Sequence, residues 1–156
     1  MPILALAANT PHIVFEDIQQ QSPIPLLSIV EATCAAAIAL RVTTVGLFGH
    51  RFTMQGHFYS KVFAKQGISV VVPCQEDQDY IHEKYMGELV QGIFLPETRE
   101  RLLEIVGRMK EENGIQGLIL GGTELPLILR DETYKAIPFL DTTRIHVKHA
   151  VAQMLS

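Results

Sequence analysis

The sequence predicts an α/β fold in which helices flank parallel β-sheets arranged as two small lobes. Short apolar runs rich in Val, Ile and Leu alternate with longer amphipathic stretches, which is the pattern of repeated strand-helix units. The apolar runs lack polar alternation, and this indicates strands buried on both faces of a sheet. With 156 residues, of which 47% are hydrophobic, the chain can bury a working core as one ordinary domain or as two lobes.

Each expected element follows from this alternation and from local start signals. The expected strands are 3–7, 25–29, 44–48, 69–72, 117–120 and 138–140. The expected helices are 11–20, 29–40, 53–65, 77–92, 97–112, 123–129 and 142–155. Pro11 suits a first helical turn, and Thr53, Thr123 and Thr142 stand near helix starts, where hydroxyl side chains are preferred.

The strand pattern also predicts where the lobes divide. Crossings near residues 41 and 135 separate a compact α/β lobe, 42–135, from a thinner partial lobe formed by 1–41 and 136–156. The uncharged strand 3–7 is suited to the middle of a parallel sheet, yet two residues precede it. Because an exposed strand edge invites pairing, we expect either a missing N-terminal segment, which we favour, or a partner subunit that covers the strand.

Charge and composition argue against several classes of partner. The formal charge of −4 and the pI near 5.8, without a run of Lys or Arg, do not suit nucleic acid or an anionic membrane. Residues 1–8 are apolar but lack a basic segment, so they do not predict a signal peptide or a membrane span, and a cytoplasmic location is expected. Cys34 lies in an apolar helix and Cys74 in a loop, and both are expected to be reduced.

Three loops carry the residues best suited to chemistry. They are 8–12, 48–53 and 120–124, and each places small residues at a turn and a hydroxyl or amide at a helix start. In open α/β sheets, ligands bind at the carboxyl ends of strands, where backbone N–H groups point outward. The sequence has neither standard phosphate-binding glycine motif, so small organic anions fit better than nucleotides. The alternative interpretation is that Asn9, Thr53 and Thr123 are helix caps.

Several motifs stand in a fixed order along the chain. They are Asn9-Thr10-Pro11-His12, the segment 25–33, Gly46-Leu47-Phe48-Gly49 with 51–54, Glu88-Leu89 followed by Gly92, 121–126 and 140–143. Together they resemble the aspartate/glutamate racemase family over essentially the whole chain. The resemblance implies two similar lobes with a ligand cleft between them, often in a homodimer. It also implies a racemase that needs no pyridoxal phosphate, metal or other cofactor.

The resemblance further implies two catalytic cysteines, one just before the Asn-Thr of the first loop and one just before the Thr-Glu of the last. Inversion needs an acid and a base on opposite faces of the α-carbon, and thiols at helix N-termini have pKa values low enough to serve. In this sequence the two positions hold Ala8 and Gly122, which cannot exchange a proton. Racemization by two thiols is therefore not expected, and no catalytic residue is identified.

The resemblance also assigns a binding shell. The matching positions are Asn9, Thr10, Thr53, Thr123 and Glu124, which we expect to form a cradle for a substrate carboxylate or amino group. The N-terminal part of the family pattern, with a Gly-rich loop, is not found in this sequence.

Two positions depart from the family within the matched region. His50 stands where relatives commonly have a small hydroxyl residue, and Gln91 lies near a position that is Lys in some of them. Both substitutions are expected to weaken recognition of a second carboxylate.

Histidines offer further candidates. His146 and His149 lie three residues apart on a predicted helix, but without a third ligand no metal site is expected. His12 and His50 both lie in cleft loops. His50 could replace a thiol as the base, with a solvated loop histidine as the alternative.

The leading hypothesis is an amino-acid racemase-family protein whose relatives act on aspartate, glutamate or similar small amino acids, with low or absent activity in this chain. The alternative is a non-catalytic binding or regulatory protein for an amino acid or small carboxylate, because the anion-binding loops remain while the thiols do not. A truncated or degenerate product without a function of its own is a third possibility. The expected partners are a small-molecule ligand and a second copy of the chain.

Overall fold

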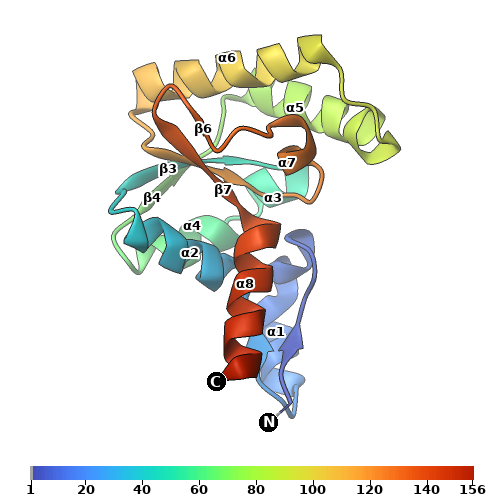
Figure 1. Cartoon of the computed structure of the whole chain (residues 1–156), viewed down its shortest axis with the longest axis vertical. Helices are drawn as coiled ribbons and strands as arrows, with labels where there is room; N and C mark the ends of the chain where they lie inside the picture. The colour runs from blue at the N-terminus through green and yellow to red at the C-terminus, as the bar shows by residue number, and fades with distance from the viewer. Residues whose placement is uncertain (1) are drawn as a thin grey trace.

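A computed structural model describes residues 2–156. Its centre is a five-stranded sheet with the strand order β4-β3-β5-β7-β6 (Figure 1). The strands are β3 (Thr44–Phe48), β4 (Ser69–Val71), β5 (Gly117–Leu120), β6 (Thr133–Tyr134) and β7 (Ile137–Asp141). All pairs are parallel except β6 with β7. The predicted α/β fold class is confirmed.

Helices cover both faces of this sheet. On one face lie α2 (Ile29–Ala39) and α4 (Phe58–Ala64), and on the other lie α5 (Gln75–Gly87) and α6 (Pro96–Asn113) (Figure 1). Ile119 of β5 packs into the first core, whereas Leu118 and Leu120 pack into the second. Because both faces of β5 are buried, its sequence is continuously apolar, as the sequence predicts.

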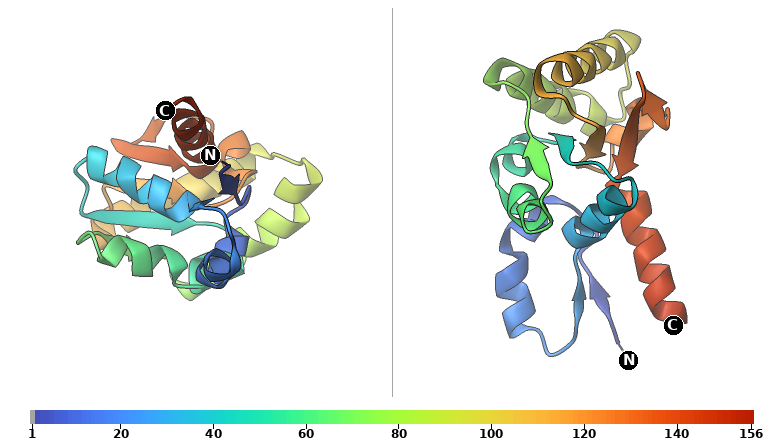
Figure 2. Two further views of the ribbon diagram at one scale, coloured as in Figure 1. Left: turned by 90° about the horizontal axis from the view of Figure 1, so that it is seen from below. Right: turned by 90° about the vertical axis from the view of Figure 1, so that its left-hand side faces the viewer.

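A separate two-stranded parallel sheet lies at the end of the molecule that holds both termini (Figure 2). It pairs β1 (Leu4–Ala5) with β2 (Leu26–Leu27), and between them the chain forms the 3₁₀ helix η1 (Thr10–Val14) and α1 (Phe15–Gln21). The long C-terminal helix α8 (Thr142–Leu155) runs from the end of β7 alongside this part of the molecule.

Predicted strands and helices differ from the structure mainly at their ends. The first two strands are shorter than the expected 3–7 and 25–29. The division into lobes 1–41 plus 136–156 and 42–135 stays a prediction. In the structure, β7 hydrogen-bonds within the five-stranded sheet, and α2 packs against the same sheet.

The predicted helix 53–65 is wrong, and strand β6 is not among the predicted strands. The expected helix 53–65 is two helices, α3 (Arg51–Gln55) and α4, because Gly56 and His57 interrupt it and His57 has a left-handed φ of 59°. Helix α5 ends at Gly87 and is followed by the 3₁₀ helix η2 (Leu89–Gln91), while α7 spans Leu125–Ile128. None of the helices within residues 2–156 combines the length and apolar character needed to cross a membrane.

Candidate functional site

The loops after β3 and β5 meet at the carboxyl edge of the sheet. The backbone N–H of Gly121 donates to the carbonyl of Phe48 over 2.7 Å. A Cβ atom on Gly121 would lie 2.7 Å from that carbonyl oxygen, so the close approach requires glycine. Two of the three predicted loops are thereby held side by side, and the first loop joins them through side chains.

Asn9 fastens the first loop to this edge. Its Nδ2 donates to Thr142 Oγ1 over 3.0 Å, its Oδ1 accepts from the Tyr59 hydroxyl, and Thr142 Oγ1 donates to the Leu120 carbonyl over 2.8 Å. Asn9 is 3% exposed and makes no cap hydrogen bond to η1. The cap interpretation is therefore wrong for Asn9, because its side-chain amide bonds to Thr142 and Tyr59 instead.

Thr10 and Thr53 face each other across the loops. Their Oγ1 atoms lie 3.4 Å apart, and Thr10 Oγ1 lies 2.6 Å from His50 Nε2. Thr53 is buried inside α3, and His50 is the residue that precedes this helix, so Thr53 is not its cap. The structure thus brings these predicted residues together, and it adds an imidazole to them.

His50 is half-buried and touches groups from several elements. Its ring meets Tyr85 edge-on with centroids 5.7 Å apart, and it lies 6.4 Å from the ring of His82. Burial and the neighbouring His82 lower the pKa of His50, and the charge of Glu124 partly opposes this. His50 is thus partly solvated with a fixed hydroxyl partner in Thr10, and its role as a replacement base stays a prediction.

The space beside Gly122 is occupied by Tyr85 of α5. A Cβ atom on Gly122 would lie 2.0 Å from the Tyr85 hydroxyl oxygen and 2.7 Å from Cζ. The phenol therefore fills the position from which a residue-122 side chain would project. Sequence reasoning missed Tyr85, because nothing local to α5 indicates that its ring reaches this loop.

Tyr85 and Glu124 form a hydrogen-bonded pair. The Tyr85 hydroxyl donates to Glu124 Oε2 over 2.5 Å. Burial and this bond raise the pKa of Tyr85 well above its ordinary range. Burial acts to raise the pKa of Glu124, but the hydrogen bonds from Tyr85 and Thr123 outweigh it and lower that pKa. Near neutral pH the pair is a phenol that donates to a carboxylate.

The remaining predicted site positions lie at the rim. Ala8 and Thr123 are exposed, and Glu124 rather than Thr123 precedes α7. Gln91 is exposed on η2. Two cavities, of about 880 and 550 Å³, touch the three loops only at His12 and Leu120. The first lies beside α1 and α4 and the second beside α2 and α8.

His12 is a structural residue. Its Nδ1 lies 2.8 Å from the Ala8 carbonyl, and its Nε2 accepts from the backbone N–H of Ile29 over 3.0 Å. An accepting Nε2 requires the neutral ring, with the proton on Nδ1. Burial lowers the pKa of His12 to about 4, so the ring stays neutral at physiological pH. His12 thereby ties the first loop to the start of α2.

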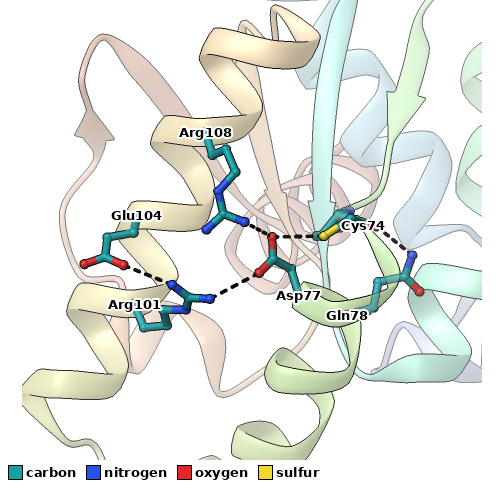
Figure 3. Close-up of polar contacts among 7 residues, drawn as sticks. Cys74, Asp77, Gln78, Arg101, Glu104 and Arg108 are labelled. Atoms are coloured by element: carbon teal, nitrogen blue, oxygen red, sulfur yellow. Dashed lines mark hydrogen bonds and ion pairs between the residues drawn. The ribbon is translucent and has the colours of Figure 1, made fainter.

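The other singled-out residues form no metal centre. Within residues 2–156, no three His, Cys, Asp or Glu side chains gather as a metal site would require. Cys34 is buried in α2, and Cys74 is an exposed free thiol that donates to Asp77 Oδ2 over 3.4 Å. Asp77 in turn binds Arg108 of α6 (Figure 3).

The Asp/Glu/Hydantoin racemase family model matches residues 2–150. The chain belongs to the Asp/Glu/hydantoin racemase family. A crystal structure of an aspartate racemase homologue from Pyrococcus horikoshii OT3 is 31% identical, with a TM-score of 0.87, and the match covers 99% of this chain and 67% of that one. Picrophilus torridus aspartate racemase shares the fold, with a TM-score of 0.78 at 21% identity, over 97% of this chain and 61% of that one.

Two curated relatives differ in length. The broad specificity amino-acid racemase RacX from Bacillus subtilis (strain 168) is 26% identical over an alignment of 159 positions. The match covers 98% of this chain and 65% of RacX. An uncharacterized protein encoded in the pnlA 3′ region of Pectobacterium carotovorum subsp. carotovorum is 29% identical over 143 residues. That match covers 88% of this chain and 90% of the Pectobacterium protein. This racemase-family chain thus spans about two thirds of RacX but nearly all of the Pectobacterium protein.

Proposed function

We propose that this racemase-family protein binds a small amino acid or carboxylate at the three loops and does not racemise it with a thiol pair. The observation that carries the proposal is the Tyr85 phenol beside Gly122, hydrogen-bonded to Glu124. The space that a thiol would need is filled by a side chain that belongs to the core. Such replacement by a well-packed group favours a changed function over simple decay of the site.

The groups around the loops suit the two ends of an amino acid. Glu124 is half-buried with a lowered pKa, so its carboxylate is available to a ligand ammonium group. Thr10 is half-buried and Thr123 is exposed, so both can offer hydroxyls to a ligand carboxylate, whereas the buried Thr53 lies behind Thr10 with its Oγ1 3.4 Å away. Aspartate and glutamate are the first ligands to test.

Ligand binding is measured by thermal unfolding with L- and D-aspartate and L- and D-glutamate. A ligand at about 100 times its Kd stabilises the folded state by about 2.7 kcal/mol. Glu124→Gln should weaken this stabilisation, whereas Glu111→Gln on the exposed surface of α6 should leave it unchanged. If none of the four ligands raises the unfolding temperature, the binding function is wrong.

The absence of thiol chemistry is tested by chiral chromatography and by restoring the cysteines. We expect no interconversion of the enantiomers by the natural chain. The pair Ala8→Cys and Gly122→Cys should also fail, because the new Cβ atom would lie 2.0 Å from the Tyr85 hydroxyl oxygen. Adding Tyr85→Leu to this pair of cysteines removes the phenol from the space beside residue 122. Interconversion by the unmodified chain would contradict the proposal.

We also propose that the assembly is a homodimer. Support comes from exposed apolar side chains on β1 and α8, namely Leu4, Val147 and Val151, which a second copy of the chain would cover. Sedimentation velocity over a range of concentrations should find a dimer. Val151→Glu should shift the population to the monomer, and a natural chain that stays monomeric throughout would refute the dimer.

A further inference from the structure

We propose that Thr10 and His50 form a proton-transfer pair that exchanges the α-proton of a bound amino acid on one face, with retention of configuration. This activity rests on the proposed ligand binding but goes beyond it. It also differs from racemization, which requires transfer on both faces.

The first support is the geometry of the pair. Thr10 Oγ1 and His50 Nε2 lie 2.6 Å apart, within the range at which a hydroxyl passes its proton to an imidazole base. Thr10 stands two residues after Ala8, so its hydroxyl belongs to the loop that lacks the first thiol. Both side chains are half-buried, so they are held in place yet reachable from solvent.

The second support is the set of groups that face His50. Tyr85 and His82 face it from α5, and Glu124 faces it from the loop before α7. Burial and His82 lower the pKa of His50, which keeps the ring neutral and able to accept a proton at pH 7. The Glu124 carboxylate then stabilises the imidazolium that forms.

The other proton donor beside the pair is a weak acid, and this explains why we expect exchange with retention. At Gly122 the thiol position is taken by the Tyr85 hydroxyl, which donates to Glu124. With its pKa raised, this phenol stays protonated and is 4% exposed. It is therefore a poor acid for the α-carbon, so the returned proton should come through Thr10 to the face from which the first proton left.

The proposed transfer of the α-proton needs no cofactor. The ligand Cα–H bond breaks and its proton goes to Thr10 Oγ1, while the Thr10 proton moves to His50 Nε2. The electron pair that remains on the α-carbon is delocalised into the ligand carboxyl group. In the reverse direction His50, re-equilibrated with water, returns a solvent proton through Thr10 to the same face.

The experiment incubates the full chain with L-aspartate and L-glutamate in deuterated water. Proton NMR measures loss of the α-proton signal, chiral chromatography measures configuration, and thermal unfolding measures binding. We expect α-deuteration with retention, lowered about 100-fold in His50→Gln because general base catalysis contributes at least that factor. Thr10→Val should behave likewise, whereas Thr10→Ser should retain exchange.

His57→Asn is the matched control, because it removes an exposed imidazole and keeps a residue that tolerates the left-handed backbone. Exchange in this variant should equal that of the natural chain. Because the pKa of His50 is lowered, the rate should fall with pH only in a range more acidic than that in which an ordinary histidine becomes protonated.

The outcomes separate the two proposals. Ligand stabilisation without exchange leaves the binding function intact and overturns the proton-transfer pair. Exchange that survives in His50→Gln, or that is accompanied by equal inversion, overturns the pair as well. Absence of any ligand binding removes both proposals together.

Discussion

Gly122 and Tyr85 are coupled residues, because the phenol occupies the space beside the glycine. Gly122→Ala should lower the free energy of unfolding by about 2 kcal/mol, the usual effect of overpacking a filled site. Urea unfolding of Gly122→Ala, Tyr85→Leu and the double variant measures the coupling. In the Tyr85→Leu background the alanine should be nearly neutral, and strictly additive effects would contradict the packing arrangement.

For the residues of the site, the sequence predicts which loops they lie in better than it predicts their roles. Motif order places Thr10, Thr53 and Glu124 at strand ends, and the structure brings them together with His50. The contributions of Tyr85 and the buried position of Asn9 depend on how α5 and α8 dock on the sheet. No local pattern encodes that docking, so these contacts emerge only from tertiary packing.

Among the elements, α5 and α6 are joined by a buried carboxylate. Asp77 is 3% exposed and pairs with Arg108 at 2.5 Å and with Arg101 at 3.7 Å (Figure 3). Asp77→Ala would leave two arginines facing a void, and their partial exposure limits the loss to about 2 kcal/mol. Glu104→Ala, which breaks only an exposed pair with Arg101, should cost less than about 0.5 kcal/mol in urea unfolding. Equal losses would contradict the role of Asp77.

The segment from η1 to α2 carries a pH-sensitive contact through His12. Its pKa falls from 6.5 to about 4 on folding, so below pH 6.5 the unfolded chain binds a proton that the folded chain does not. Stability is therefore lost as pH falls, by about 2 kcal/mol between pH 6.5 and about pH 5. Denaturant unfolding at several pH values in this range should show a free energy of unfolding that falls as the pH falls.

The free energy of unfolding should depend less on pH in His12→Gln, and its pH dependence should be unchanged in His57→Asn. Burial also lowers the pKa of His146, whose ring lies 6.3 Å from that of His12, so part of the slope should remain in His12→Gln. A variant with the full slope of the natural chain would contradict the assignment to His12.

Element boundaries follow the sequence where a strand is buried on both faces. The strands 44–48 and 117–120 match their predicted ranges, because a continuous apolar run ends where burial ends. The break between α3 and α4 was missed, since Gly56 alone is a weak stop signal and the left-handed His57 has no mark in the sequence. Strand β6 has two residues and depends on pairing with β7, so its sequence gave no independent signal.

For the molecule as a whole, the Asn9 network joins the terminal two-stranded sheet to the five-stranded sheet. Asn9 lies in the first loop, which follows β1, whereas its partners are Tyr59 of α4 and Thr142 at the start of α8. Asn9→Ala should lower the free energy of unfolding by about 2 kcal/mol, because it removes the acceptor of the buried Tyr59 hydroxyl and the donor to Thr142 Oγ1. Thr142→Val should have a similar effect, and the two losses should not add, since both break one network.

Thr143 supplies the matched control for this network. Its buried Oγ1 has no hydrogen-bond partner among residues 2–156, so Thr143→Val removes a hydroxyl from the neighbouring position without breaking a bond. This variant should be as stable as the natural chain or slightly more so. If Thr142→Val and Thr143→Val unfold at the same urea concentration, the two sheets are held together by apolar packing, and the Asn9 network is not what couples them.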